Sequence, residues 1–102
     1  MKFVFAVLFA LGVLISGSAA ASEKLAQSSA CMTCHAIDKK TIGPSYKDIA
    51  AKYRNDKSAE ASLIKKVKAG GSGVWGPTPM PPNAHVKEDD IKAIVGWILT
   101  LK

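Results

Sequence analysis

The chain has 102 residues, 48% hydrophobic and 22% charged, and its 14 Lys and Arg exceed its 8 Asp and Glu to give a net charge of +6. Compact domains typically span about 100 to 150 residues, so this length allows one small domain and excludes a doubly wound nucleotide-binding domain, a barrel or a two-domain enzyme. A basic balance favours acidic partner surfaces. We expect no nucleic-acid binding, because the lysines are spread along the chain rather than grouped beside aromatic residues.

The N-terminus predicts a cleaved secretory signal peptide over residues 1–21. Lys2 precedes a short, uncharged apolar run at residues 3–15, and small residues then surround an expected cleavage site after Ala20 or Ala21. The run is shorter than the roughly 20 apolar residues that a membrane-spanning helix needs. We therefore expect export to the periplasm without stable membrane insertion, and one mature domain over residues 22–102.

A mature domain of about 80 residues lies near the size at which a protein core alone is marginal and a further stabilising element is usually needed. The chain has two cysteines, Cys31 and Cys34. A disulfide between them would close a very short loop and would constrain the unfolded chain little. The pair therefore indicates a chemical rather than an architectural role.

Residues 31–35 form a C-x-x-C-H motif, which in an exported protein is typical of covalent attachment of haem c. Two thiols one helical turn apart can each add across one vinyl group of the porphyrin, and His35 follows directly as an axial ligand. A thioredoxin-like redox pair is an alternative, but it needs a βαβ setting that this sequence does not predict. A zinc site is another, but it needs two further ligands, and only His85 remains.

Met80 is the candidate for the second axial ligand. It lies in an irregular stretch, residues 70–86, that carries four Gly and four Pro, and so long a loop is uncommon in a compact domain unless it is functional. The flanking prolines favour extended geometry at Met80, and its soft thioether would favour ferrous iron and raise the reduction potential. A core role for Met80 and ligation by His85 are the alternatives, whereas Met32, inside the haem motif, is not expected to reach the opposite face.

The remaining pattern predicts four helices and no strands, at residues 23–32, 46–53, 59–69 and 88–101. The first helix is expected to present the cysteines. The apolar faces of the other three are Tyr46, Ile49, Ala50 and Tyr53, then Leu63, Ile64 and Val67, then Ile91, Ile94, Val95, Ile98 and Leu101.

Local signals mark the ends of these helices. Ser58 is the expected N-cap of the third helix and Gly70 its stop. Lys87 stands before the last helix, where Ser or Asp would be the usual cap. Gly96 lies inside that helix at a cost of about 1 kcal/mol relative to Ala, which predicts close contact there with the first helix.

Several segments together resemble the small bacterial cytochromes c of the c-551/c-552 type. They are the C-x-x-C-H motif, the Ile-Gly-Pro at residues 42–44, residues 73–83 from Gly-Val-Trp-Gly to Met-Pro-Pro-Asn, and the closing Gly-Trp-Ile-Leu at residues 96–99. The resemblance covers essentially the whole mature chain. It implies an all-α class I cytochrome c fold wrapped round one haem c, which is bound through two thioethers.

The same resemblance implies roles for five further positions. His35 and Met80 would be the axial ligands of the iron. The Pro44 carbonyl would accept a hydrogen bond from the His35 ring, Trp75 would donate one to a haem propionate, and Asn83 would hydrogen-bond near the Met80 sulfur.

These features predict a monomeric periplasmic electron carrier, not an enzyme, that exchanges single electrons by outer-sphere transfer at an exposed haem edge. Its partners would be redox proteins with acidic docking surfaces, such as a nitrite reductase, a terminal oxidase, a peroxidase or a cytochrome bc-type complex. The lysines expected to steer such encounters are Lys39, Lys40, Lys47, Lys52, Lys65, Lys66, Lys68 and Lys87. The alternative is a haem-based enzyme or gas sensor in which Met80 leaves the iron readily.

Overall fold

The computed structural model describes residues 18–102, so residues 1–17 of the expected leader lie outside the described residues. The described part is helical, as predicted, apart from an isolated antiparallel bridge between Gly71 and Met80. Its elements are α1 (Ser18–Ser28), the 3₁₀ helix η1 (Cys31–Thr33), α2 (Tyr46–Tyr53), α3 (Ala59–Ala69) and α4 (Glu88–Ile98). Within residues 18–102, no helix combines the length and the apolar character needed to cross a bilayer.

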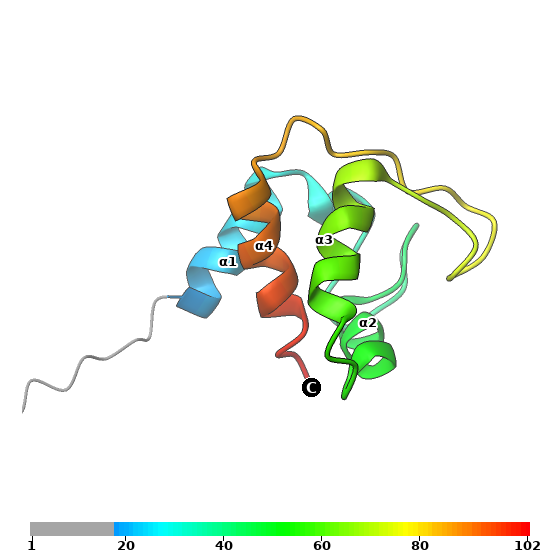
Figure 1. Cartoon of the computed structure of the whole chain (residues 1–102), viewed down its shortest axis with the longest axis horizontal. Coiled ribbons are helices and arrows are strands. Elements are labelled where there is room, and N and C mark those ends of the chain that lie inside the picture. Colours follow the sequence, from blue (N-terminus) through cyan, green and yellow to red (C-terminus); the bar gives the residue numbers. More distant parts are fainter. Residues whose placement is uncertain (1–17) are drawn as a thin grey trace, which may run out of the picture.

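The last helix, α4, is the centre of the core. It packs against α1 on one side and α3 on the other, with further contacts to α2 (Figure 1). The predicted apolar face is buried, except that Leu101 is only half-buried, and Trp97 is buried with it. Burying one Ile or Val side chain contributes about 1.5 to 3 kcal/mol, so α4 supplies a large share of the stability.

The buried side chains form two clusters that share α4. One joins α1, α2 and α4, and the other joins α4 to the half-buried face of α3. Their buried members are Ala26, Tyr46, Ile94, Trp97 and Ile98 in the first, and Val86, Ile91 and Val95 in the second.

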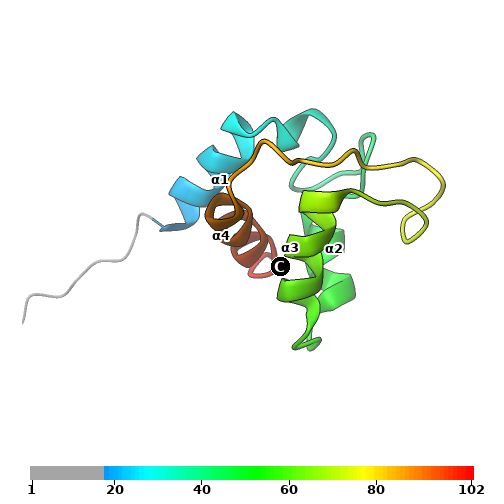
Figure 2. The same ribbon diagram turned by 45° about the horizontal axis from the view of Figure 1, so that its top comes forward.

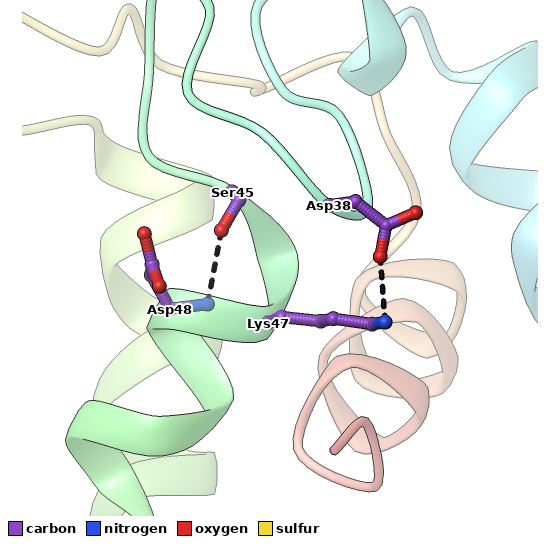
Figure 3. Close-up of polar contacts among 4 residues, drawn as sticks. All are labelled: Asp38, Ser45, Lys47 and Asp48. Atoms are coloured by element: carbon purple, nitrogen blue, oxygen red, sulfur yellow. Dashed lines mark hydrogen bonds and ion pairs between the residues drawn. The ribbon is translucent and has the colours of Figure 1, made fainter.

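Helices α2 and α3 have the predicted bounds. The side-chain oxygen of Ser45 caps α2 by accepting a hydrogen bond from the backbone N–H of Asp48 at 3.1 Å (Figure 3), which satisfies one of the free donors of the first turn. Gly70 ends α3 with φ of 77°, a left-handed conformation that glycine adopts without steric cost.

Ser58 is the N-cap residue of α3, as predicted, but its hydroxyl makes no capping hydrogen bond. It donates instead to the Asp56 carboxylate at 2.7 Å, and the backbone N–H of Ser58 donates to the same oxygen at 2.9 Å. These two hydrogen bonds lower the pKa of Asp56. An acidic side chain two residues earlier therefore outcompetes the helix for the serine.

The predicted bounds of the first helix are wrong, because α1 begins and ends earlier. Residues 19–21 are alanines, the strongest helix formers, and they extend the helix toward the N-terminus. At the other end, Ala30 adopts φ of 64° and ψ of 13°, which breaks the α-helical path. The cysteines therefore follow α1 on the separate turn η1.

Two expectations for α4 need correction. The helix ends at Ile98 rather than at residue 101. Just after it, the Thr100 hydroxyl donates a hydrogen bond to the Trp97 carbonyl at 2.6 Å and tightens the last turn. A Cβ at Gly96 would meet no heavy atom within 4 Å among the described residues, so the predicted close contact is absent. Helix α1 meets α4 through the fully buried Ala26 instead, so the small residue at this contact lies on α1.

Candidate functional site

A cavity of about 380 Å³ lies between η1, the three later helices and the loop that follows α3. Both cysteines, His35 and Met80 line it. Its helical wall is apolar apart from Lys66, and the apolar members are Tyr46, Ile49, Tyr53, Leu63, Val67, Ile91, Ile94, Val95 and Ile98. The apolar faces predicted for α2, α3 and α4 thus line a cavity as well as the core, which is typical of a cofactor site.

Cys31 and Cys34 lie at the two ends of one turn of 3₁₀ geometry. The backbone N–H of Cys34 donates to the Cys31 carbonyl at 3.3 Å, and in such a turn the side chains at positions i and i+3 eclipse. Both cysteines are half-buried and form no disulfide. Burial raises the pKa of the Cys31 thiol, the opposite of the lowered pKa that is typical of a redox-active thiol.

The His35 ring is held on several sides within the histidine segment, residues 31–45. Its Nδ1 lies 2.8 Å from the Pro44 carbonyl oxygen; because a carbonyl only accepts, Nδ1–H is the donor and Nε2 keeps its lone pair. The Tyr46 ring stacks on the imidazole at 5.4 Å between centroids. A Cβ at Gly43 would lie 2.6 Å from Cε1 of the imidazole, so only glycine fits beside the ring without movement.

Short-range hydrogen bonds close the histidine segment on itself. The Cys34 carbonyl accepts from the backbone N–H of Gly43 at 2.7 Å and from the Thr41 hydroxyl at 2.6 Å. An ion pair between Lys47 and Asp38, with 2.6 Å between Nζ and Oδ1, joins the segment to α2 (Figure 3). His35 therefore lies in a loop with its own internal hydrogen bonds.

Met80 belongs to the methionine loop, residues 70–86. Figure 1 and Figure 2 both show this loop, in yellow and orange, extending away from the helices and returning across them to α4. Met80 and Gly71 exchange two backbone hydrogen bonds, of 3.0 Å from Gly71 N to Met80 O and 2.7 Å from Met80 N to Gly71 O. This pair fixes the half-buried Met80 at the cavity.

Asn83 anchors the returning part of the methionine loop to α3. Its backbone N–H and its Nδ2 both donate to the Val67 carbonyl, at 3.1 and 3.2 Å, and Nδ2 also donates to the Pro81 carbonyl at 3.3 Å. Val67 lies in the last turn of α3, where carbonyls lack helical partners. The contact with the Met80 sulfur that the resemblance implies stays a prediction.

Trp75 and Lys66 stand where an anionic part of a cofactor could reach them. Trp75 lines the cavity, is 42% exposed, and has Lys52 Nζ 5.5 Å from its ring centroid. Lys66 is the one lysine among the described residues of the lining. From the sequence, Lys66 is predicted only as one of the lysines that steer encounters, although its place three residues after Leu63 puts it at the edge of the apolar face of α3.

The other candidates for the second ligand lie elsewhere. His85 is exposed and is not among the residues that line the cavity. Met32 packs against the core cluster between α1 and α4. Among the three, the described structure brings only Met80 to the cavity that holds His35.

Known proteins are similar to this chain in sequence and in fold. A family model described as Cytochrome c matches residues 19–102. The chain belongs to the cytochrome c family. It is 55% identical to cytochrome c-551 of Allochromatium vinosum over 87 residues, 85% of this chain and 93% of that one. It is 48% identical to cytochrome c-552 of Nitrosomonas europaea over 93 residues, 91% of this chain and 90% of that one.

The structural comparison agrees with the sequence comparison. The crystal structure of wild-type Nitrosomonas europaea cytochrome c552 superimposes with a TM-score of 0.76 at 50% identity, over 78% of this chain and 99% of that one. The predicted all-α class I fold is thereby confirmed. As a cytochrome c, the chain carries one covalently bound haem c, and two eclipsed thiols, an imidazole and a thioether around one apolar cavity fit that group.

Proposed function

We propose that this cytochrome is an exported electron carrier that passes single electrons between redox proteins in the periplasm. The observation that supports this most is the convergence of two segments on one cavity. Cys31, Cys34 and His35 come from the histidine segment, and Met80 comes from the methionine loop, 45 positions further along the chain than His35.

The proposed roles follow from the chemistry of each side chain. Cys31 and Cys34 would hold the haem through two thioethers, and His35 and Met80 would bind its iron. When bound, the haem supplies the one-electron couple of its iron. The hydrogen bond to Pro44 orients the imidazole and raises its basicity, while a thioether favours the ferrous state. With His35 and Met80 both bound to the iron, no position would be open to a substrate, which favours electron transfer.

The outer part of the cavity suits the polar edge of a haem. The propionates are carboxylates, so they need donors or cations where they are partly buried. The indole N–H of Trp75 and the ammonium group of Lys66 are of this kind, and both residues line the cavity. We assign them to the propionates.

Export with cleavage after Ala20 or Ala21 is part of the proposal. Helix α1 begins at Ser18, so cleavage there removes only its first turn and leaves the buried Ala26 in place. Mass spectrometry of the protein recovered from the periplasm should give the mass of residues 21–102 or 22–102 plus one haem. An intact chain would contradict the proposed leader.

Encounters with partners would occur on the side of the cavity that the cysteines form. Thr33 and Ile42 line the cavity there and are exposed, and Lys39 and Lys40 are exposed nearby in the chain. Lys47 and Lys68 are already engaged, one with Asp38 and the other with a backbone carbonyl. Reduction by an acidic redox protein should slow as ionic strength rises; a rate independent of salt would contradict lysine steering.

An optical spectrum tests the axial ligands. The oxidised protein should show low-spin bands and the weak far-red band of a thioether on ferric haem, and the reduced protein should bind carbon monoxide slowly or not at all. Met80→Ala should keep the covalent haem, lose the far-red band completely and bind carbon monoxide fast, whereas His85→Ala should match the parent. Fast binding by the parent would favour a gas sensor or a haem enzyme.

A further inference from the structure

Gly70 touches the backbone of the methionine loop at the point where Met80 returns to α3. A Cβ at Gly70 would lie 2.6 Å from the Met80 carbonyl oxygen, 2.8 Å from the Pro82 nitrogen and 3.1 Å from the Pro81 carbonyl carbon. All three are backbone atoms, so no side-chain rotation relieves the contact. The φ of 77° at Gly70 adds a conformation that residues with a Cβ rarely adopt.

The contact lies at the base of the loop, where both of its ends meet the last turn of α3. The Gly71–Met80 pair joins the outgoing and returning chains, and Asn83 bonds the Val67 carbonyl. Further along, Lys68 Nζ donates to the Val86 carbonyl at 3.0 Å. Because these bonds hold both chains, displacement of the Met80 carbonyl has to move the Met80 backbone and its side chain together.

We propose that Gly70 is a positioning residue for the Met80 thioether, although it makes no contact with the iron. The inference rests on the proposed ligation by Met80. A thioether is a weak ligand for ferric iron and stays bound only while the chain holds it in place. Any side chain at residue 70 separates α3 from the returning chain and shifts the thioether away from the cavity.

Gly70→Ala and Gly70→Asn in the holoprotein test this inference. At φ of 77° and ψ of 178° the backbone of Gly70 lies in a region that essentially only glycine adopts, so both variants add a Cβ and backbone strain, and they differ only in side-chain size and polarity. Both variants should keep the covalent haem, lose most of the far-red band, bind carbon monoxide faster than the parent and show a lower reduction potential. A role in ending α3 alone would instead lower the unfolding temperature and leave the spectrum unchanged.

Asn55→Ala is the matched control. Asn55 has φ of 71°, is exposed and is not among the residues that line the cavity. Alanine there imposes strain at a positive φ away from the loop, so stability should fall while the far-red band and the potential stay at the parent values.

Three outcomes would overturn the inference. Both Gly70 variants could keep the parental band and potential, Gly70→Asn alone could restore them fully, or Asn55→Ala could lose the band equally. Met80→Ala, measured alongside, separates this failure from failure of the proposed function. If Met80→Ala keeps the band, Met80 is not the ligand and both proposals fall; if it loses the band while the Gly70 variants keep it, only the role of Gly70 falls.

Discussion

The histidine segment and the methionine loop hold the two candidate ligands by different means. The histidine segment runs into the core, because its last residue Ser45 and the adjoining Tyr46 are each only 2% exposed. The Tyr46 ring stacks on His35 and meets the Trp97 ring edge-on at 5.6 Å. The imidazole is thus supported by the same side chains that hold the helices together.

The methionine loop has little of this support. Its outer part is open, with Val74 46% and Trp75 42% exposed. The loop is held mainly at its base, through hydrogen bonds to Gly71 and to the end of α3. The two ligands should therefore respond differently to perturbation: the histidine should leave only when the fold opens, whereas the methionine can leave while the fold persists.

The largest expected difference concerns Tyr46. Tyr46→Ala removes a buried ring that contacts both His35 and Trp97, so it should lower the free energy of unfolding by about 3 to 5 kcal/mol. Trp75→Ala, in the open part of the methionine loop, should cost clearly less. Denaturant unfolding of the two holoproteins measures both values, and equal losses would contradict the contrast between the regions.

Gly43→Ala tests how tightly the imidazole is enclosed. The new methyl group would lie 2.6 Å from Cε1 and 3.0 Å from Nδ1 of His35, and the bond to Pro44 prevents the ring from moving aside. Unfolding should become easier by about 1 to 3 kcal/mol, as in other overpacked cores, with a shift of the haem bands. Gly96→Ala is the control. Its methyl group would meet open space, so the substitution should raise the free energy of unfolding by about 1 kcal/mol through helix propensity.

Because the Tyr46 hydroxyl is buried, we expect the free energy of unfolding to fall at alkaline pH. Burial raises the pKa of Tyr46 above its ordinary value of 10.0, so the folded state favours the protonated phenol. The protonated phenol contributes fully to the free energy of unfolding below pH 10. This contribution is lost as pH rises toward the folded-state pKa, by up to about 1.4 kcal/mol per pH unit. The free energy of unfolding, measured from pH 9 to 11, should fall less steeply in Tyr46→Phe than in the parent. Parallel curves would mean that Tyr46 is not the group responsible.

Asn83→Ala should loosen the methionine loop while leaving the core intact. The two side-chain hydrogen bonds to Val67 and Pro81 are lost, at a combined cost of about 1 to 2 kcal/mol for a partly exposed group. On heating, the far-red band should disappear well before the helices melt, as followed by circular dichroism. The interval between the two losses should be smaller in the parent and in Asn55→Ala; if the band and the helices of Asn83→Ala disappear together, the loop is not an independent unit.

The smallest effect is expected for the ion pair between Lys47 and Asp38. Their side chains are 43% and 71% exposed, and exposed pairs typically contribute about 0 to 1 kcal/mol. Asp38→Asn should therefore cost less than about 1 kcal/mol, and the difference should vanish in concentrated salt. A larger loss would mean that this surface contact supports the histidine segment.

Local chemistry made much of this molecule predictable. Helix α2 begins where Ser45 offers a capping oxygen, and α3 ends where Gly70 permits a left-handed turn. The C-x-x-C-H motif is local as well, because its chemistry depends on a fixed spacing of two thiols and an imidazole. The prolines around Met80 similarly marked the functional loop.

The errors arose where two local preferences competed or where a distant segment decided. The Ser58 hydroxyl could cap α3 or hydrogen-bond to Asp56, and it donates to the Asp56 carboxylate. Nothing about an alanine predicts the left-handed φ at Ala30 that separates α1 from the cysteines. Gly96 suggested a close contact that α1 makes through Ala26 instead.

The sequence by itself determined the cofactor class and the bounds of two helices and marked the segments that carry the candidate ligands, because these depend on residues within a few positions of one another. Only the tertiary structure decided which glycines are indispensable and which lysine lines the cavity. Gly70 is restricted by a carbonyl ten positions away and Gly43 by a ring eight positions away. Such restrictions arise from the packing of backbone against backbone or ring, and no local preference of a glycine reveals what will lie against it.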